Sequence, residues 1–137
     1  MTLYNPKLVH TFESGYRLSN GDDLNNTIGQ ALSLFTAVAA ATAQPGGGQA
    51  LATPVTASLF RVATVATAGD SIGLPPAAPG LQPIITNASA VALDVYAAAG
   101  ADTINGAANA TAYVIAAGKT AQFFAFGPGL WHALLSA

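Results

Sequence analysis

The feature that most constrains the fold is the stretch from Leu81 to Trp131, where short apolar runs are separated by turn-forming residues. The runs are rich in Val, Ile, Tyr and Phe, and the separators include the dipeptide Asn105-Gly106. Runs of β-branched and aromatic residues bounded by Gly, Pro and Asn are typical of strands joined by tight turns. The stretch therefore predicts a series of short β-strands that carries almost no charge.

The same pattern begins near residue 49 and predicts an all-β module of about eight short strands. Along residues 91–96, large apolar side chains alternate with others, which places Asp94 on the wetter face of a half-buried strand. Many short strands separated by Gly and Pro turns indicate a β-sandwich or jelly roll. The segments with strand character are 49–55, 58–67, 71–74, 82–86, 90–97, 103–104, 111–116, 120–126 and 130–135.

The first 48 residues have a different pattern and are expected to form an N-terminal arm. Residues 1–20 show no clean period, whereas residues 21–35 place apolar side chains on one helical face and predict one short helix. Residues 36–42 are too rich in Ala to classify, and Pro45–Gly48 is expected to be a Gly-rich linker. Two interpretations of the arm stay open, because chain ends are ordered only when tied down: a mobile terminus, or an arm docked on a partner.

The low charge of the chain bears on its partners. Charged residues make up 7% of the sequence, against about 25% in an ordinary soluble domain. A surface with so few charges is covered by neutral groups or by partner subunits, as in obligate assemblies. Four scattered basic residues do not form a phosphate-tracking stripe, so we expect no nucleic-acid binding. The uncharged segment 28–43 is shorter than the roughly 20 residues that span a bilayer, so we expect no membrane partner.

Catalytic, metal and cofactor motifs are not recognisable in the sequence. The two histidines lie far apart and lack the ligand spacing of a metal site. Ser136, His132 and Asp94 provide the residue types of a catalytic triad, but without a nucleophile elbow or comparable context. Gly118–Thr120 resembles the end of a phosphate-binding loop, yet the upstream glycine is missing. We therefore expect no enzyme activity, no metal and no cofactor.

Aromatic residues are the remaining candidates for a functional role. Aromatic side chains concentrate in cores and at the centres of subunit interfaces, so we interpret them as packing or interface residues rather than as a ligand site. The candidate interface residues are Tyr4, Phe12 and Tyr16 in the arm, and Tyr96, Tyr113 and Trp131 in the β-module.

Several short motifs, taken in order, resemble one family. They are V-x-T-V-x-x-x-x-D-S-I-x-L-P at 62–75, I-I-T-N-A-S-A at 84–90, L-D-V-Y at 93–96, D-T-I-N-G at 102–106, A-A-G-K-T at 116–120 and G-x-W at 129–131. Together they resemble the jelly-roll cement, or decoration, proteins on the capsids of tailed bacteriophages. The resemblance covers about residues 49–137, and related modules occur in phage fibre and spike proteins.

The resemblance implies a non-enzymatic virion protein on the outer capsid surface. Its partners would be the major capsid protein and further copies of itself, with a homodimer favoured and a trimer as the alternative. Its function would be to clamp neighbouring capsid subunits through many weak contacts. The alternative function is a receptor- or glycan-binding module of a phage fibre or spike.

Overall fold

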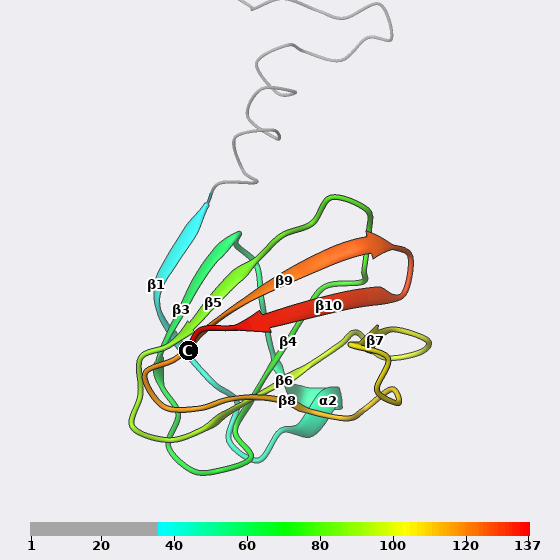
Figure 1. Cartoon of the computed structure of the whole chain (residues 1–137). Coiled ribbons are helices and arrows are strands. Elements are labelled where there is room, and N and C mark those ends of the chain that lie inside the picture. The colour runs from blue at the N-terminus through cyan, green and yellow to red at the C-terminus, as the bar shows by residue number, and fades with distance from the viewer. Residues whose placement is uncertain (1–35) are drawn as a thin grey trace, which may run out of the picture. The chain divides into compact units, whose positions relative to one another are not determined.

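Ten strands and one short helix follow one another along residues 36–137, the part of the chain that this computed structural model describes (Figure 1). Residues Ala37–Ala137 form one compact unit. The elements are β1 (Ala37–Thr42), α2 (Gly48–Leu51), β2 (Thr53–Pro54), β3 (Leu59–Thr64), β4 (Ser71–Gly73), β5 (Ile84–Asn87), β6 (Leu93–Tyr96), β7 (Thr103–Ile104), β8 (Tyr113–Ile115), β9 (Thr120–Gly127) and β10 (Leu130–Leu135).

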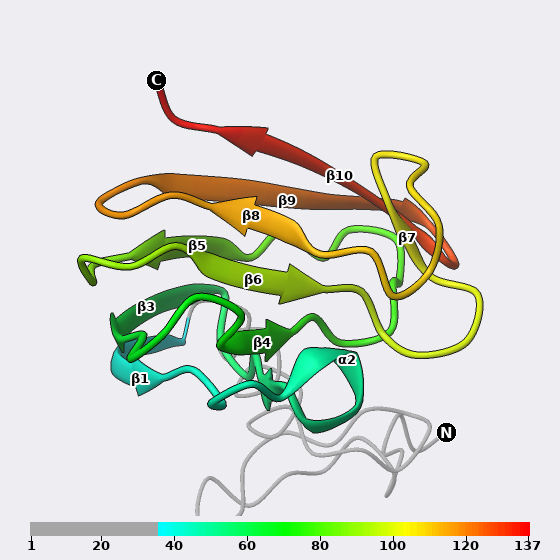
Figure 2. The ribbon, with the colours of Figure 1, turned by 90° about the horizontal axis from the view of Figure 1, so that it is seen from below.

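The strands form two sheets between which the chain alternates. The larger sheet has the order β1-β3-β5-β9-β10-β7, and the smaller has the order β2-β4-β6-β8. From β1 to β9, each strand in one sheet is followed by a strand in the other. Figure 2 shows the strands of each sheet side by side, with α2 next to β4. Each full turn of the chain therefore adds one strand to the larger sheet and one to the smaller sheet.

This alternation makes most neighbouring strands parallel. The pairs β1–β3 and β3–β5 are parallel in the larger sheet, and β2–β4 and β4–β6 are parallel in the smaller one. A jelly roll is built from antiparallel strands, so the pairing is closer to the stacked coils of a β-solenoid. The all-β class that the sequence predicted is confirmed.

The hydrophobic core lies between the two sheets and follows the period of two along each strand. In β9, Ala121, Phe123 and Ala125 point inward and are buried. The largest fully buried apolar side chains are Trp131, Phe123, Ile72, Ile85, Leu93, Ile115, Val62 and Val95. These residues come from both sheets, so the sheets are held together mainly by apolar burial.

Three differences from the sequence prediction have local causes. The Ala-rich run 37–42 is strand β1, because pairing with β3 overrides the weak strand propensity of Ala. Residues 49–55, predicted as one strand, contain helix α2 followed by the short β2. The β-module therefore begins at Ala37, not at residue 49. The arm 1–20 and the helix 21–35 lie outside the described residues.

Helix α2 has only four residues, and side-chain hydrogen bonds hold it in place. Gln49 Nε2 donates to the carbonyl of Ala97 at 3.0 Å and to Asn109 Oδ1 at 3.3 Å. Asn109 Nδ2 in turn donates to the carbonyls of Ala98 and Asp102. These amides connect α2 to the long loop around β7. The segment that was expected to be a linker before residue 49 is therefore tied to the rest of the module.

A buried carboxylate, that of Asp70, ties two loops together. Its oxygens accept hydrogen bonds from the backbone N–H groups of Gly46, Ala66 and Thr67 and from the Thr67 hydroxyl, at 2.8–3.1 Å. The N–H of Thr67 is the largest cause that lowers the pKa of Asp70 below its ordinary value of 3.8, and burial opposes it. Because Asp70 is fully buried, these donors replace the water that a charged carboxylate needs.

Candidate binding surface

The outer face of the larger sheet exposes an unusual number of large apolar side chains. Strand alternation sends Phe124 and Phe126 of β9 outward while Phe123 points into the core. Phe126 is 72% exposed and Leu134 of β10 is 65% exposed. We call this surface the outer apolar face; its residues are Leu59, Ile84, Phe124, Phe126, Leu130, His132 and Leu134.

Strand register assembles this face from residues far apart in the sequence. One row of paired residues crosses four strands through Leu59, Ile84, Gln122 and Leu134. A second row pairs Phe124 with His132. Cross-strand neighbours on one face lie within contact distance of each other, so the register brings these apolar side chains onto one surface, with Gln122 between Ile84 and Leu134.

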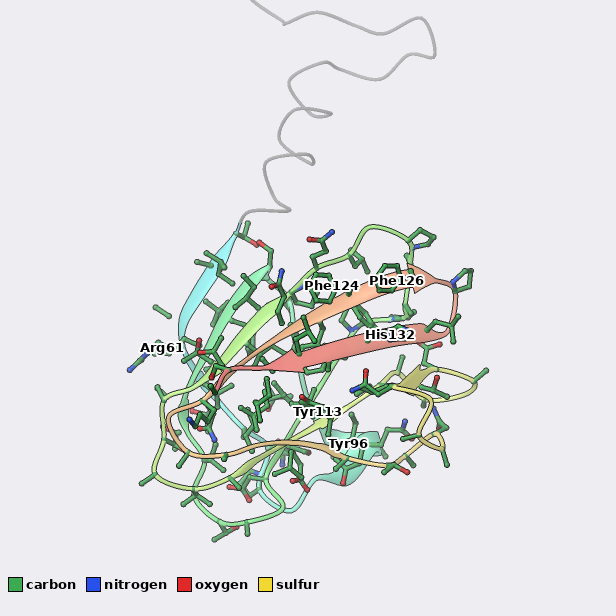
Figure 3. All side chains as sticks on the ribbon, in the orientation of Figure 1. Arg61, Tyr96, Tyr113, Phe124, Phe126 and His132 are labelled. Atoms are coloured by element: carbon green, nitrogen blue, oxygen red, sulfur yellow. The ribbon has the colours of Figure 1, made fainter. Side chains whose placement is uncertain are left out.

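Aromatic rings cluster at one end of the outer apolar face. The Phe126 ring meets the imidazole of His132 edge-on, with centroids 5.2 Å apart and an interplanar angle of 86°. Phe124 and Phe126 have centroids 6.2 Å apart. Figure 3 shows these three side chains along β9 and β10, with Arg61 at the opposite side of the sheet. Edge-to-face geometry stabilises the pair and leaves much of the Phe126 ring accessible.

The outer apolar face has little charge of its own. At its border, Arg61 donates from Nη1 to the carbonyl of Ala39 at 2.9 Å. The three carboxylates within residues 36–137 lie elsewhere. Asp70 is in the turn before β4, Asp94 is on β6 of the smaller sheet, and Asp102 accepts a hydrogen bond from the N–H of Ala77. An apolar sheet face with so little charge is a candidate for contact with another macromolecule.

The six predicted interface residues have different outcomes. Trp131 is 1% exposed and belongs to the core, which agrees with the packing role, and not the interface role, that the sequence left open. Tyr113 is half-buried and packs edge-on against Phe123, with centroids 5.5 Å apart. Tyr96 is half-buried on β6, where it alternates with the buried Val95. Tyr4, Phe12 and Tyr16 lie outside the described residues.

The sequence did not identify Phe124, Phe126 and Leu134 as a shared surface. The segment Q-F-F-A-F at 122–126 places aromatic residues on both faces of β9. Alternation is clear at 120–123, where the polar Thr120 and Gln122 lie on one face, but Phe124 and Phe126 continue that face with aromatic residues. The polar residues on that face, and the small Ala121 and Ala125 on the face of Phe123, were the available signal.

Burial of Trp131 leads to a first prediction. Its indole Nε1–H is buried and has no hydrogen-bond partner within the described part of the chain. A buried unpaired donor costs about 1–3 kcal/mol, so Trp131→Phe is expected to change the free energy of unfolding by less than about 1 kcal/mol, despite the smaller ring. Urea unfolding followed by circular dichroism measures this. A loss near 3 kcal/mol would contradict the prediction and indicate that the N–H is paired.

Within residues 36–137, the structure does not bring together the members of the suggested catalytic triad. His132 points outward from the larger sheet and Asp94 outward from the smaller sheet, so the core separates the two members of the suggested triad. Gly118 and Lys119 lie in the turn between β8 and β9, in which Lys119 N–H donates to the carbonyl of Ala116, and Thr120 begins β9. Residues 36–137 hold no cluster of three metal-ligating side chains. No helix within this range is long and apolar enough to cross a membrane.

Comparison with family models, with curated proteins and with solved structures finds no match to the chain.

Proposed function

We propose that the protein is a structural component of a tailed-bacteriophage virion, which binds the outside of the capsid and cements neighbouring major capsid protein subunits. The observation that carries the proposal is the outer apolar face, a binding surface without a catalytic group. The low charge of the whole chain supports it, as does the order along the sequence of the short motifs between residues 62 and 131. Weak apolar contacts of this kind become strong when many copies bind one lattice.

The proposed assembly includes contacts between copies of the protein, with a homodimer favoured over a trimer. Closed two-fold assemblies are the commonest soluble oligomers. The jelly-roll fold implied by the resemblance is part of the same proposal, and two packed sheets of short strands support it. The parallel pairs β1–β3–β5 and β2–β4–β6 are a difference from that fold.

A substitution within the outer apolar face tests the capsid role. Leu134→Asp places a charge on the β10 side of the outer apolar face and is expected to weaken binding to decoration-free capsids at least about tenfold, because an unpaired charge is costly to desolvate. The matched control is Leu51→Asp on α2, since Leu51 is equally exposed, at 69%, and α2 packs beside the smaller sheet. Co-sedimentation with capsids measures both variants.

Two results would count against the capsid role. Equal binding by the two variants would show that the outer apolar face is not the contact surface. Capsids that keep their full heat resistance without the protein would show that it does not act as a cement.

One observation favours the alternative, a glycan-binding module of a fibre or spike. The Phe126 ring is 72% exposed and offers an apolar surface on which a sugar ring can stack. Binding of host-surface polysaccharide that is lost in Phe126→Ser but kept in Leu51→Ser would support this alternative. Labelling over the capsid shell, together with no glycan binding, would exclude it.

A further inference from the structure

Strand β10 has an edge that β7 covers only in part. The two residues of β7 pair with Leu130 and Trp131. Further along β10, Ala133 pairs with Phe123, whose N–H donates to Pro83 on the opposite side of β9. In an antiparallel pair, residues that hydrogen-bond to the neighbouring strand alternate with residues whose backbone groups point away from it. The backbone N–H and C=O groups of Ala133 and Leu135 therefore point away from β9. These groups form the part of the β10 edge that β7 does not cover.

The side chain of Asn105 occupies this edge directly beyond β7. Its Oδ1 accepts from the N–H of Ala133 at 2.8 Å, and its Nδ2 donates to the carbonyl of Ala133 at 3.3 Å. Its own backbone N–H donates to the carbonyl of Trp131 at 2.9 Å. The side-chain amide therefore takes the place of a peptide group and extends the β7 ladder by one step.

A tight turn fixes the position of this amide. Asn105 and Gly106 both have positive φ, at 51° and 73°, and the N–H of Ala107 donates to the carbonyl of Ile104 at 3.0 Å. Positive φ at both central residues is the pattern of a type I′ turn, for which Asn-Gly is the preferred dipeptide. The same residue thus forms the turn and closes the edge.

We propose that Asn105 closes the β10 edge against a second copy of the chain, and that removal of its side chain lets two copies pair antiparallel through β10. The strand reads L-W-H-A-L-L and contains neither proline nor a permanently charged residue, the usual protections of an edge. A two-fold axis beside β10 would bring the backbone groups of Ala133 and Leu135 opposite the same groups of the partner copy.

The other edge strands, β1, β2 and β8, have features that hinder pairing, and β8 is only three residues long. Strand β2 is two residues long and ends at Pro54. Strand β1 has a register irregularity between Val38 and Ala41, where Arg61 bonds to Ala39. Short strands, proline and bulges all hinder pairing with another chain. Removal of one side chain therefore has its largest effect on β10.

Asn105→Gly in the full chain tests the proposal. Glycine adopts positive φ freely, so the turn is kept and only the amide is lost. The variant is expected to strengthen self-association at least about tenfold relative to the parent, because backbone bonds to a partner replace those to Asn105. Sedimentation velocity over a range of concentrations measures the association. Hydrogen exchange at the Ala133 amide confirms that the edge is open at low concentration.

A second variant assigns the association to this edge. Adding Leu135→Lys to Asn105→Gly is expected to restore the parental sedimentation, since a lysine on an edge strand opposes pairing. The proposal is overturned if Asn105→Gly sediments like the parent although the Ala133 amide exchanges faster. It is also overturned if Leu135→Lys does not reverse the association. Neither outcome depends on whether the protein binds capsids.

Discussion

Replacing Phe123 with alanine is expected to remove a large part of the module's free energy of unfolding. Phe123 is fully buried and packs against Tyr113 in the core. Truncation of a buried phenylalanine costs about 3–5 kcal/mol, while small domains have about 5–15 kcal/mol of stability in total. Chemical denaturation, followed by the fluorescence of the single tryptophan, measures the change in the free energy of unfolding.

The matched control is Phe126→Ala, three residues along the same strand. Phe126 points to solvent, and within residues 36–137 its ring contacts two other rings, those of Phe124 and His132. Its loss is expected to cost less than about 1 kcal/mol. Equal losses for the two variants would contradict the assignment of inner and outer faces on β9, and with it the outer apolar face.

Asp70→Asn is expected to lower the melting temperature at neutral pH by on the order of 10 °C. The change keeps the size of the side chain but replaces an accepting oxygen with an N–H₂ group. That group then faces backbone N–H donors, either those of Ala66 and Thr67 or that of Gly46, so donors meet donors in a buried site. Asp102→Asn is the control, because a single backbone N–H, that of Ala77, bonds to the Asp102 carboxylate.

The same carboxylate sets a pH dependence. The pKa of Asp70 is lower in the folded protein than its ordinary value of 3.8, so the folded state favours the charged form. Its stabilising contribution is complete above pH 3.8 and is lost as the pH falls through the lower, folded pKa. Burial raises the pKa of Asp94 instead, so protonation of Asp94 acts in the opposite direction.

The difference between the parent and Asp70→Asn isolates the Asp70 contribution, because Asp94 is present in both. Thermal unfolding between pH 2 and pH 7 should show a gap that is constant near neutrality and narrows in acid. A gap that does not change with pH would contradict a charged, buried Asp70.

Strand positions could be predicted from sequence where turn chemistry was explicit. The limits of β7 and β10 agree with the predicted segments 103–104 and 130–135, because Asn105-Gly106 and Gly127–Gly129 mark where the chain reverses. Alternation along 91–96 placed Asp94 on the outer side of β6. In these segments the local pattern and the fold require the same residues.

Strand direction and the composition of the binding surface could not be predicted in this way. A period of two is the same in parallel and antiparallel strands, so the sequence did not reveal that β3 pairs with β1 and β5 in parallel. Trp131 is buried next to strand β7, where it pairs with Ile104, 27 residues away in sequence. Such long-range pairing, rather than local composition, brings Leu59 and Leu134 into one row.

The alternation of the chain between two sheets also determines the order in which contacts can form during folding. Among the described strands, β9 and β10 are the only consecutive pair that hydrogen-bond to each other. A hairpin closes in about 1–10 μs, whereas every other pair must first close a loop that passes through the opposite sheet. Loop closure of this kind slows folding because its entropy is lost before the contact is gained. We therefore expect the β9–β10 hairpin, which also carries Phe126 and Leu134, to form first and the preceding strands to assemble onto it.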